Sequence, residues 1–520
     1  MTRIEAKTPS HLLLTLSILL VASAAFAFGI GARGYWDISE LPPDPGRAFG
    51  RLLSPLDWGQ EPPLRDALVA LFAAPLERPG PAVARGPSLL GALLLVFLAA
   101  SEAHRRCGAL GALTASALVV ASPLVFFEAQ WGDATMLSGA LAAAAGLATF
   151  DLAFPRPTLE RPKPSAAKAA ACVFFAGLAG GGDALLIAIM PAVVASLCGD
   201  RELRSKRLSA LAAPAFLAFL LFGVGAVRAL LGGSFFPPRA PFEWTPAIVT
   251  AGGMAVSLPL LLAYVRHRRL RETSFEPAAR AIAFVTVALL AATALRDPAA
   301  GLLAAHLPAV VLVTEAAIEA RAGSMRFAPR ARLALPAAFA GLSLLAAGIF
   351  GALVAERSEG ASRGISLAVL VCAVAGAAAA AFAPSYRVRL GAIAIVALVV
   401  GPFVRFGVLP LFDWNRAADA LAARAAAEAA ATGRPLVLFA LESPLVDRAL
   451  ADRGAPSEPT NDPVVLVSRL AGAERVAALL GEEAFARIRS IDPSLPLHVR
   501  HVASRDGRRF LVVSNRAGGT

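Results

Sequence analysis

Two adjoining stretches decide the fold: HLLLTLSILLVASAAFAFGIGA (residues 11–32) and RGYWDISE (residues 33–40). The first is apolar and long enough to cross a bilayer, which takes about 20 residues. The second is charged and is followed by a proline-rich region that closes with QEPPL (residues 60–64). Such sequence cannot lie among lipid tails, so it must sit at the far membrane surface. No small-residue cleavage site follows residue 32, and we therefore interpret the first stretch as a retained anchor.

The composition identifies the class of protein. Of the 520 residues, 57% are hydrophobic and 17% are charged, and the mean hydropathy is +0.65. Soluble globular proteins are much less apolar, so the chain is predicted to cross the membrane many times. The net charge of +12 comes from basic residues dispersed at the edges of apolar stretches. No basic face interleaved with aromatic residues is present, and no nucleic-acid partner is expected.

Thirteen membrane spans are predicted. The segment 168–198 is too long for one untilted span and is interrupted by Gly180-Gly181-Gly182-Asp183, so we interpret it as two short helices that enter and leave on the same side. The other eleven are 11–32, 87–103, 108–127, 135–154, 208–231, 246–265, 280–295, 300–320, 334–355, 365–384 and 390–410. The predicted fold is an α-helical polytopic membrane protein with a multi-pass module at residues 1–412.

The distribution of basic residues predicts the orientation. Lys and Arg are retained preferentially in cytoplasmic loops, and the loops at 104–106, 201–207, 266–271 and 321–332 are basic. This alternation requires the broken hairpin at 168–198 and a cytoplasmic N-terminus. Residues 33–86 and the C-terminal tail are then expected outside, on the far side of the membrane.

From Asp413 to Thr520 the sequence becomes charged and predicts a small α/β domain outside the membrane. We expect a helix at 414–431, strands at 435–441 and 463–468, and helical structure at 473–489. Two alternating runs, 497–503 and 508–514, flank Asp506-Gly507, which is a strong hairpin signal.

Several segments resemble, in the same order, those of one membrane enzyme family. They are the aromatic-Asp loop Tyr35-Trp36-Asp37, the closure Pro62-Pro63-Leu64, the amphipathic stretch 65–76, the second outside loop 122–137, the Gly-Leu-Ala hairpin 176–191 and His306-Leu307-Pro308. Together these segments resemble the GT-C-type integral membrane glycosyltransferases, in particular the protein-mannosyltransferase-like and aminoarabinose-transferase-like branch. The resemblance covers roughly residues 10–320, and the remainder agrees only in architecture.

The resemblance implies transfer of a sugar from a polyprenyl-phosphate donor to an acceptor on the outer face. Asp37 matches the catalytic acid of the family and would accept the proton of the attacking hydroxyl. The departing phosphate needs positive charge, for which Arg296, Arg239 and Arg33 are the outside-facing candidates. A divalent cation would serve the same purpose. Its candidate ligands, which are also candidates for acceptor binding, are Glu128 and Asp133 with Glu40 or Glu61.

The sequence departs from the family pattern at three places. Glu61 stands where the closure commonly has His, Gly182-Asp183 replaces a Lys or Arg, and Ile38 follows Asp37 where many members have an Asp-Glu pair. An altered substrate, a carboxylate-rich metal site and an inactive relative all fit these changes. The alternatives to an enzyme are a non-catalytic assembly scaffold and a transporter of a lipid-linked precursor.

Two of the candidate residues also have simpler interpretations. Asp133 stands where a helix begins, and an acid there stabilises the helix N-terminus. Arg239 and Arg296 are expected at the membrane interface, where arginines anchor spans.

Overall fold

A computed structural model describes the chain. It describes residues 11–27, 42–53, 62–76, 79–120, 122–155, 165–231, 276–293, 295–321, 418–441, 444–472, 474–505 and 508–516, together with Ile30, 264–266, Arg268, Val371 and Ala375. These residues fall into two compact units. The first unit contains the described residues within 1–28, 43–75 and 85–407. The second unit contains the described residues within 29–42, 76–84 and 408–520.

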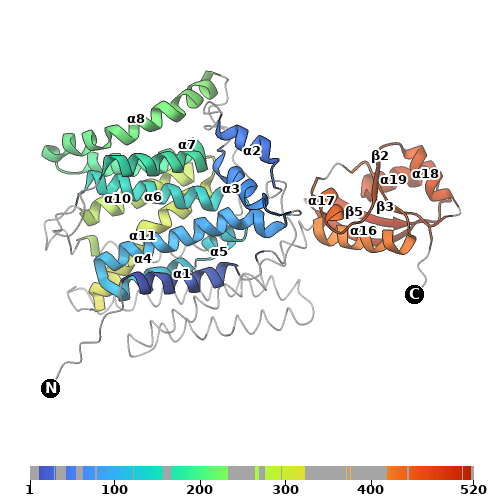
Figure 1. Cartoon of the computed structure of the whole chain (residues 1–520), viewed down its shortest axis with the longest axis horizontal. Helices are drawn as coiled ribbons and strands as arrows, with labels where there is room; N and C mark the ends of the chain where they lie inside the picture. The colour runs from blue at the N-terminus through green and yellow to red at the C-terminus, as the bar shows by residue number, and fades with distance from the viewer. Residues whose placement is uncertain are drawn as a thin grey trace. The chain divides into compact units, whose positions relative to one another are not determined.

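The long helices of the first unit form an apolar bundle and run roughly parallel to one another (Figure 1). Its helices are α1 (His11–Ala27), α2 (Pro45–Leu52), α3 (Leu64–Ala73), α4 (Pro81–Val120), α5 (Pro123–Ala129), α6 (Thr135–Ala153), α7 (Ala166–Cys198), α8 (Arg201–Leu231), α10 (Glu276–Thr293) and α11 (Pro298–Arg321). Among the described residues, five helices (α4, α6, α7, α10 and α11) are long and apolar enough to cross a membrane. The chain is therefore a multi-pass membrane protein. The count of thirteen stays a prediction, because the spans at 246–265, 334–355, 365–384 and 390–410 lie wholly or almost wholly outside the described residues.

Two glycines turn the chain where turns were predicted. Gly108 has φ 69° and divides α4 just after the basic loop 104–106, and Gly181 has φ 57° and divides α7. L-residues with a side chain rarely adopt this left-handed backbone, so glycine is required at both positions. The interruption predicted at Gly180-Asp183 is present.

Helix α7 turns back on itself at this interruption. Gly180 lies against Ser138 near the start of α6, whereas Ala192 and Ala195 share a hydrophobic cluster with Phe150 near the end of α6. The second half of α7 therefore runs parallel to α6. The first half begins only a short link after the end of α6 and returns to its start, so both ends of α7 lie at the same end of the bundle.

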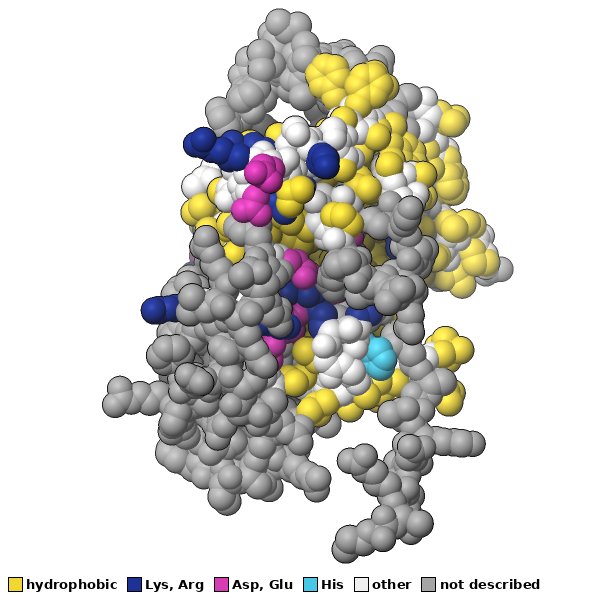
Figure 2. Space-filling model, turned by 90° about the vertical axis from the view of Figure 1, so that its left-hand side faces the viewer, with side chains coloured by type: hydrophobic (Ala, Val, Ile, Leu, Met, Phe, Trp, Pro, Cys, Tyr) yellow, Lys and Arg dark blue, Asp and Glu magenta, His cyan; other side chains and the backbone are white. Residues whose placement is uncertain are grey.

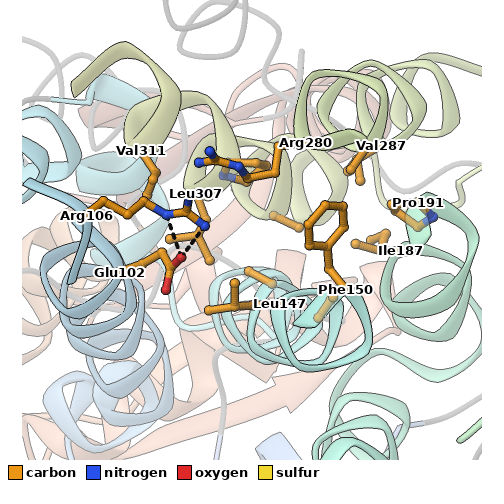
Figure 3. A pocket seen from close by; sticks show the side chains of 16 residues that line it. Glu102, Arg106, Leu147, Phe150, Ile187, Pro191, Arg280, Val287, Leu307 and Val311 are labelled. Atoms are coloured by element: carbon orange, nitrogen blue, oxygen red, sulfur yellow. Dashed lines mark hydrogen bonds and ion pairs between the residues drawn. The ribbon is translucent and has the colours of Figure 1, made fainter. Parts of the chain in front are cut away.

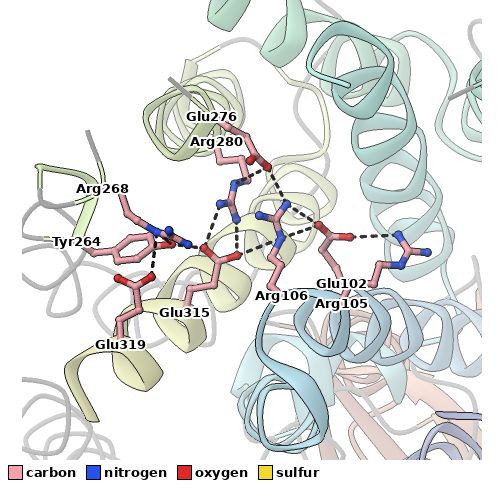
Figure 4. A network of polar contacts seen from close by, with 9 residues as sticks. All are labelled: Glu102, Arg105, Arg106, Tyr264, Arg268, Glu276, Arg280, Glu315 and Glu319. Carbon is pink, nitrogen blue, oxygen red and sulfur yellow. Dashed lines mark hydrogen bonds and ion pairs between the residues drawn. The ribbon is translucent and has the colours of Figure 1, made fainter. Parts of the chain in front are cut away.

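Nine charged and polar side chains form a network among α4, α10, α11 and the short helical piece at 264–268 (Figure 4). Glu315 accepts hydrogen bonds from Arg280 at 2.7 and 3.0 Å and from the Tyr264 hydroxyl at 2.5 Å, and its Oε1 lies 3.0 Å from Arg106 Nε. Arg106 also contacts Glu102 at 2.6 Å and Glu276 at 3.1 Å. Charges inside an apolar bundle persist only when paired, so this network fixes α4 against α10 and α11.

Charged side chains of both signs gather at the centre of the face shown in Figure 2, and hydrophobic side chains lie above and below them. Three further residues, Arg268, Glu319 and Arg105, extend the network at its edges. Arg268 pairs with Glu319 at 2.9 Å, and Arg105 pairs with Glu102 at 3.3 Å. All nine members thus have partners of opposite charge or a hydrogen bond within the network.

The second unit contains a five-stranded sheet in the order β2-β1-β3-β5-β4. Its elements are α16 (Ala418–Thr432), β1 (Leu436–Phe439), α17 (Pro444–Asp452), β2 (Ser457–Thr460), α18 (Pro463–Ala471), β3 (Ala477–Gly481), α19 (Glu482–Ile491), β4 (His498–Arg505) and β5 (Arg508–Ser514). Strands β1, β2 and β3 are parallel, and β5 is antiparallel to β3 and to β4. Alternate residues of β1 pack on opposite faces, Leu436 and Leu438 with α16 and α17, and Val437 and Phe439 with α18 and α19.

Two predictions for this tail are wrong. The segment predicted as a strand at 463–468 is helix α18, which begins because Asp462 accepts the N–H of Val464 at 2.8 Å and Pro463 occupies the first turn. The segment predicted as helical at 473–489 contains strand β3 before helix α19. The predicted β4 and β5 strands are present, and their turn at Asp506-Gly507 lies outside the described residues.

The network predicts a large cost for removing its central acid. Glu315→Gln leaves Arg106 and Arg280 without a carboxylate inside the bundle, and breaking a buried pair in this way costs about 3–5 kcal/mol. Glu482→Gln is the matched control, because Glu482 and Arg509 form a pair whose side chains are 56% and 64% exposed and such pairs contribute about 0–1 kcal/mol. Thermal unfolding in detergent should show a lower melting temperature for Glu315→Gln alone. Equal melting temperatures of both variants would contradict the role of the network.

Candidate active site

Three aspartates lie close together at one end of the bundle. This is the end where α6 and α11 begin and where α7 turns. Asp133 precedes α6, Asp297 precedes α11, and Asp183 follows the turn at Gly181. Asp183 Oδ2 accepts the backbone N–H of Asp297 at 2.9 Å, which ties the turn of α7 to the start of α11. Asp297 Oδ1 in turn accepts the N–H of Ala300 at 3.1 Å and caps α11.

Thr135 links two of these acids through a single hydroxyl group. Its Oγ1 lies 3.0 Å from Asp133 Oδ2 and 2.9 Å from Asp297 Oδ2. A threonine hydroxyl has one proton to donate, so both contacts are hydrogen bonds only when one of the two carboxyl groups is protonated. The geometry therefore favours one shared proton between Asp133 and Asp297.

The surroundings of Asp133 raise its proton affinity. Burial raises the pKa of Asp133 to about 7, and the neighbouring Asp297 carboxylate adds to this shift. Burial also raises the pKa of Asp297, against the lowering effect of its hydrogen bonds from Ala300 and Thr135. Two buried carboxyl groups so close together do not both ionise readily, since each charge disfavours the other.

Helices of the region that follows α1 cover this acidic cluster. Arg65 of α3 donates from Nε and Nη2 to the carbonyl oxygen of Gly132 at 3.0 and 2.6 Å, and its Nη1 pairs with Asp66 at 2.8 Å. Asp66 also pairs with Arg51 of α2 at 2.9 Å. The amphipathic stretch predicted at 65–76 is thus helix α3, and it holds the residues just before α6.

Three of the predicted site residues lie within the described part of the chain. Arg296 is exposed beside the cluster. Its backbone N–H donates to the Asp183 carboxylate, and its positive charge stabilises that carboxylate. Asp133 lies just before α6 and accepts the N–H of Thr135, the first residue of that helix, at 3.0 Å. Glu128 is buried at the end of α5. The other predicted residues, Asp37, Arg33, Arg239, Glu40 and Glu61, lie outside the described residues.

Three residues of the cluster carry no predicted site role: Thr135, Asp183 and Asp297. The sequence contained features that indicate the two acids. Asp297 precedes Pro298 at the start of a predicted span, and Asp183 follows a run of glycines. In the predicted topology both positions share the outer surface with Asp133. Combining these two facts would have placed the three acids together.

Two solved structures match nearly the whole chain. Both are crystal structures of ArnT from Cupriavidus metallidurans, one in the apo state and one bound to undecaprenyl phosphate. Each match has 18% sequence identity and covers 98% of this chain and 99% of the ArnT chain, with TM-scores of 0.59 and 0.58. The chain has the fold of ArnT. No family model and no curated protein sequence matches it.

ArnT is an aminoarabinose transferase with a GT-C-type fold, so the family resemblance seen in the sequence is confirmed as a likeness of fold.

The shared proton predicts how stability depends on pH. Because the folded-state pKa of Asp133 is about 7 and its ordinary value is 3.8, the native state keeps a proton that the unfolded chain has lost between these values. Stability should therefore fall as the pH rises through this window. Asp133→Asn removes this carboxyl group and its charge, which disfavours ionisation of Asp297, so the variant should lose less stability between about pH 5 and about pH 8.

The measurement is the melting temperature in detergent at both pH values. The control is Asp200→Asn, since Asp200 is exposed before α8 and Asn also caps helices well. Identical pH dependence of wild type and Asp133→Asn would show that Asp133 is not the group that retains the proton.

Proposed function

We propose that the chain is a glycosyltransferase that moves a sugar from a polyprenyl-phosphate carrier to an acceptor at the outer face of a bacterial inner membrane. The observation that carries this proposal is the ArnT fold over 98% of the chain. One of the two ArnT structures is bound to undecaprenyl phosphate, a carrier of this chemical class. A long isoprenoid with a phosphate head suits a multi-pass bundle whose outer end is polar.

The reaction proposed is a single displacement with inversion at the anomeric carbon. The acceptor hydroxyl oxygen forms the new glycosidic bond while the bond from the anomeric carbon to the phosphate oxygen breaks. Asp37 accepts the hydroxyl proton, and the polyprenyl phosphate leaves with the electron pair of the broken bond. Arg296 stabilises the charge that develops on this phosphate, with Arg239 and Arg33 as further candidates.

The described acids do not fit a metal site. In this part of the chain no three His, Cys, Asp or Glu residues converge to hold a metal ion. Both oxygens of Asp133 are already engaged with Thr135, Oδ1 with its backbone N–H and Oδ2 with its hydroxyl group. The metal site predicted from Asp133 and Glu128 with Glu40 or Glu61 stays a prediction, because Glu40 and Glu61 lie outside the described residues. No step of the proposed reaction is assigned to a cation.

The orientation in the membrane follows from the basic loops. With a cytoplasmic N-terminus, the loop 33–86, the acidic cluster and the C-terminal α/β unit would share the outer side. The donor and an extracytoplasmic lipid, glycan or protein acceptor would meet there. This side is where the head of a carrier lipid would present its sugar.

A second candidate function is a non-catalytic membrane scaffold. It is favoured by Asp183, which stands where the family has Lys or Arg and whose carboxylate binds the backbone of Asp297. An acid in that position holds two helices together and supplies no positive charge for a phosphate. A transfer assay distinguishes the two functions.

The transfer assay also tests the base. Purified wild-type protein, incubated with radiolabelled polyprenyl-phosphate sugars and envelope lipids, should release labelled product. Asp37→Asn keeps the size of the side chain but accepts no proton at neutral pH, so turnover should fall by about 10²- to 10⁴-fold while donor binding persists. The control Glu40→Gln should cost much less. Near-normal transfer by Asp37→Asn would remove the base assignment, and a wild type inactive on every donor would favour the scaffold.

Arg296→Ala tests the phosphate contact. Loss of a charge-assisted hydrogen bond should weaken donor binding by about 1.5–3 kcal/mol, measured as a higher donor concentration for half-maximal transfer. Arg201→Ala removes an exposed arginine at the start of α8 and should leave this concentration unchanged. If both variants behave as wild type, Arg296 is an interface anchor only.

A further inference from the structure

Arg296 lies in the short link between α10 and α11, and the residue on each side of it is held in place. Before it, Leu295 is buried, with 1% of its surface exposed. After it, Asp297 accepts the N–H of Ala300 at 3.1 Å and so caps α11. Arg296 itself is exposed. Because both neighbours are fixed, its side chain starts from a defined backbone position and loses less freedom when it binds a ligand.

The lack of a side chain at Gly301 makes room for Leu295. A Cβ atom at Gly301 would lie 2.6 Å from Leu295 Cδ1 and 2.7 Å from the Cβ of Ala291. Both distances are too short for carbon atoms in contact, so Leu295 can pack here only beside a glycine. The backbone N–H of Leu295 also donates to the carbonyl oxygen of Leu290 at 3.0 Å. The link is thus anchored on the side of α10.

Asp183 anchors the link on the other side. Its Oδ2 accepts the backbone N–H of Asp297 at 2.9 Å, and its carboxylate also accepts the backbone N–H of Arg296. Hydrogen bonds from two consecutive N–H groups to an acid are charge-assisted and fix the peptide group between them. The anchor belongs to another helix, because Asp183 lies in α7, 114 residues before Asp297. The direction in which the side chain of Arg296 leaves the backbone therefore depends on Asp183.

Two other arginines of the bundle, Arg106 and Arg280, line an internal cavity (Figure 3). The cavity has a volume of about 70 Å³, which is room for a few water molecules. Sites for small organic ligands have about 300–1,000 Å³. Arg106 is paired with Glu102 at 2.6 Å, and Arg280 is paired with Glu315 at 2.7 Å. These two arginines therefore stabilise the bundle, and a phosphate on a lipid carrier does not fit between them.

We propose that Asp183 is a positioning residue for the binding of the polyprenyl phosphate. It holds the backbone of Arg296 so that the guanidinium group meets the phosphate at the end of the bundle where α11 begins. This inference rests on the proposed function, in which Arg296 contacts the phosphate. Asp183 supplies no positive charge of its own, and its carboxylate contacts backbone N–H groups. It therefore acts on the phosphate through Arg296 and not by direct contact.

The first experiment measures the binding of undecaprenyl phosphate and of undecaprenol to the full chain by native mass spectrometry. The two lipids differ only in the phosphate group, so the ratio of their affinities reports the phosphate contact. Asp183→Ala should lower the affinity for undecaprenyl phosphate at least about threefold and leave that for undecaprenol unchanged. The control Asp200→Ala, at an exposed position before α8, should change neither affinity. An equal loss for both lipids would indicate a general packing defect and overturn the positioning role.

A double-mutant cycle shows whether Asp183 acts through Arg296. In the Arg296→Ala background, Asp183→Ala should change the affinity for undecaprenyl phosphate by less than about twofold, because the group that it positions is gone. Gly301→Ala displaces Leu295 and should weaken the binding of undecaprenyl phosphate alone, without a change at Asp183. Additive effects of Asp183→Ala and Arg296→Ala would overturn the proposal. So would unchanged binding of undecaprenyl phosphate in both Asp183→Ala and Gly301→Ala.

The binding measurements and the transfer assay fail independently. A wild type that binds undecaprenyl phosphate with this coupling but transfers no sugar would support the positioning role and contradict the proposed function. A wild type that transfers sugar while the two substitutions act additively would do the reverse. A wild type that transfers no sugar and binds the two lipids equally would contradict both.

Discussion

The pairing of Glu315 with Arg106 and Arg280 is the constraint on which the bundle depends. A lipid-embedded charge without a partner is costly, so these three side chains can exist between helices only in one mutual register. That register fixes how far α4 and α11 slide along each other. The start of α11 lies at the other end of one of these helices, so the ion pairs also fix its position.

Because α6 and α11 begin at the same level of the bundle, the hydroxyl of Thr135 lies between Asp133 and Asp297. Shifting α11 by one residue would move Asp297 by about 1.5 Å along the axis and break its contact with Thr135. The polar cluster is therefore held by contacts at both ends of the spans. Arg65 stabilises the cluster further, because its guanidinium group donates two hydrogen bonds to the carbonyl oxygen of Gly132, just before α6.

Hydrophobic length and basic loops predicted most of the described membrane unit, including the turns near Gly108 and Gly181, because lipid allows few structures for an apolar chain. The tail was harder to predict. The valine-rich run at 464–467 favours a strand, but Asp462 and Pro463 start a helix whose Leu466 and Leu470 are buried. Strand β3 is rich in Ala and Leu, and its burial on both faces overrides helix propensity. The acidic cluster could not be predicted from local sequence patterns, because it depends on the distances between residues of different spans.

The turn in α7 has a consequence for biogenesis. Each half of the helix is shorter than the span of about 20 residues that a translocon accepts readily, and Asp183 stands between the halves. Neither half is expected to enter the bilayer alone. The two must insert together as a pair, and the carboxyl group must be carried through the hydrocarbon before it reaches the amide of Asp297. Synthesis of α7 is thus completed well before its acid finds a partner more than a hundred residues downstream.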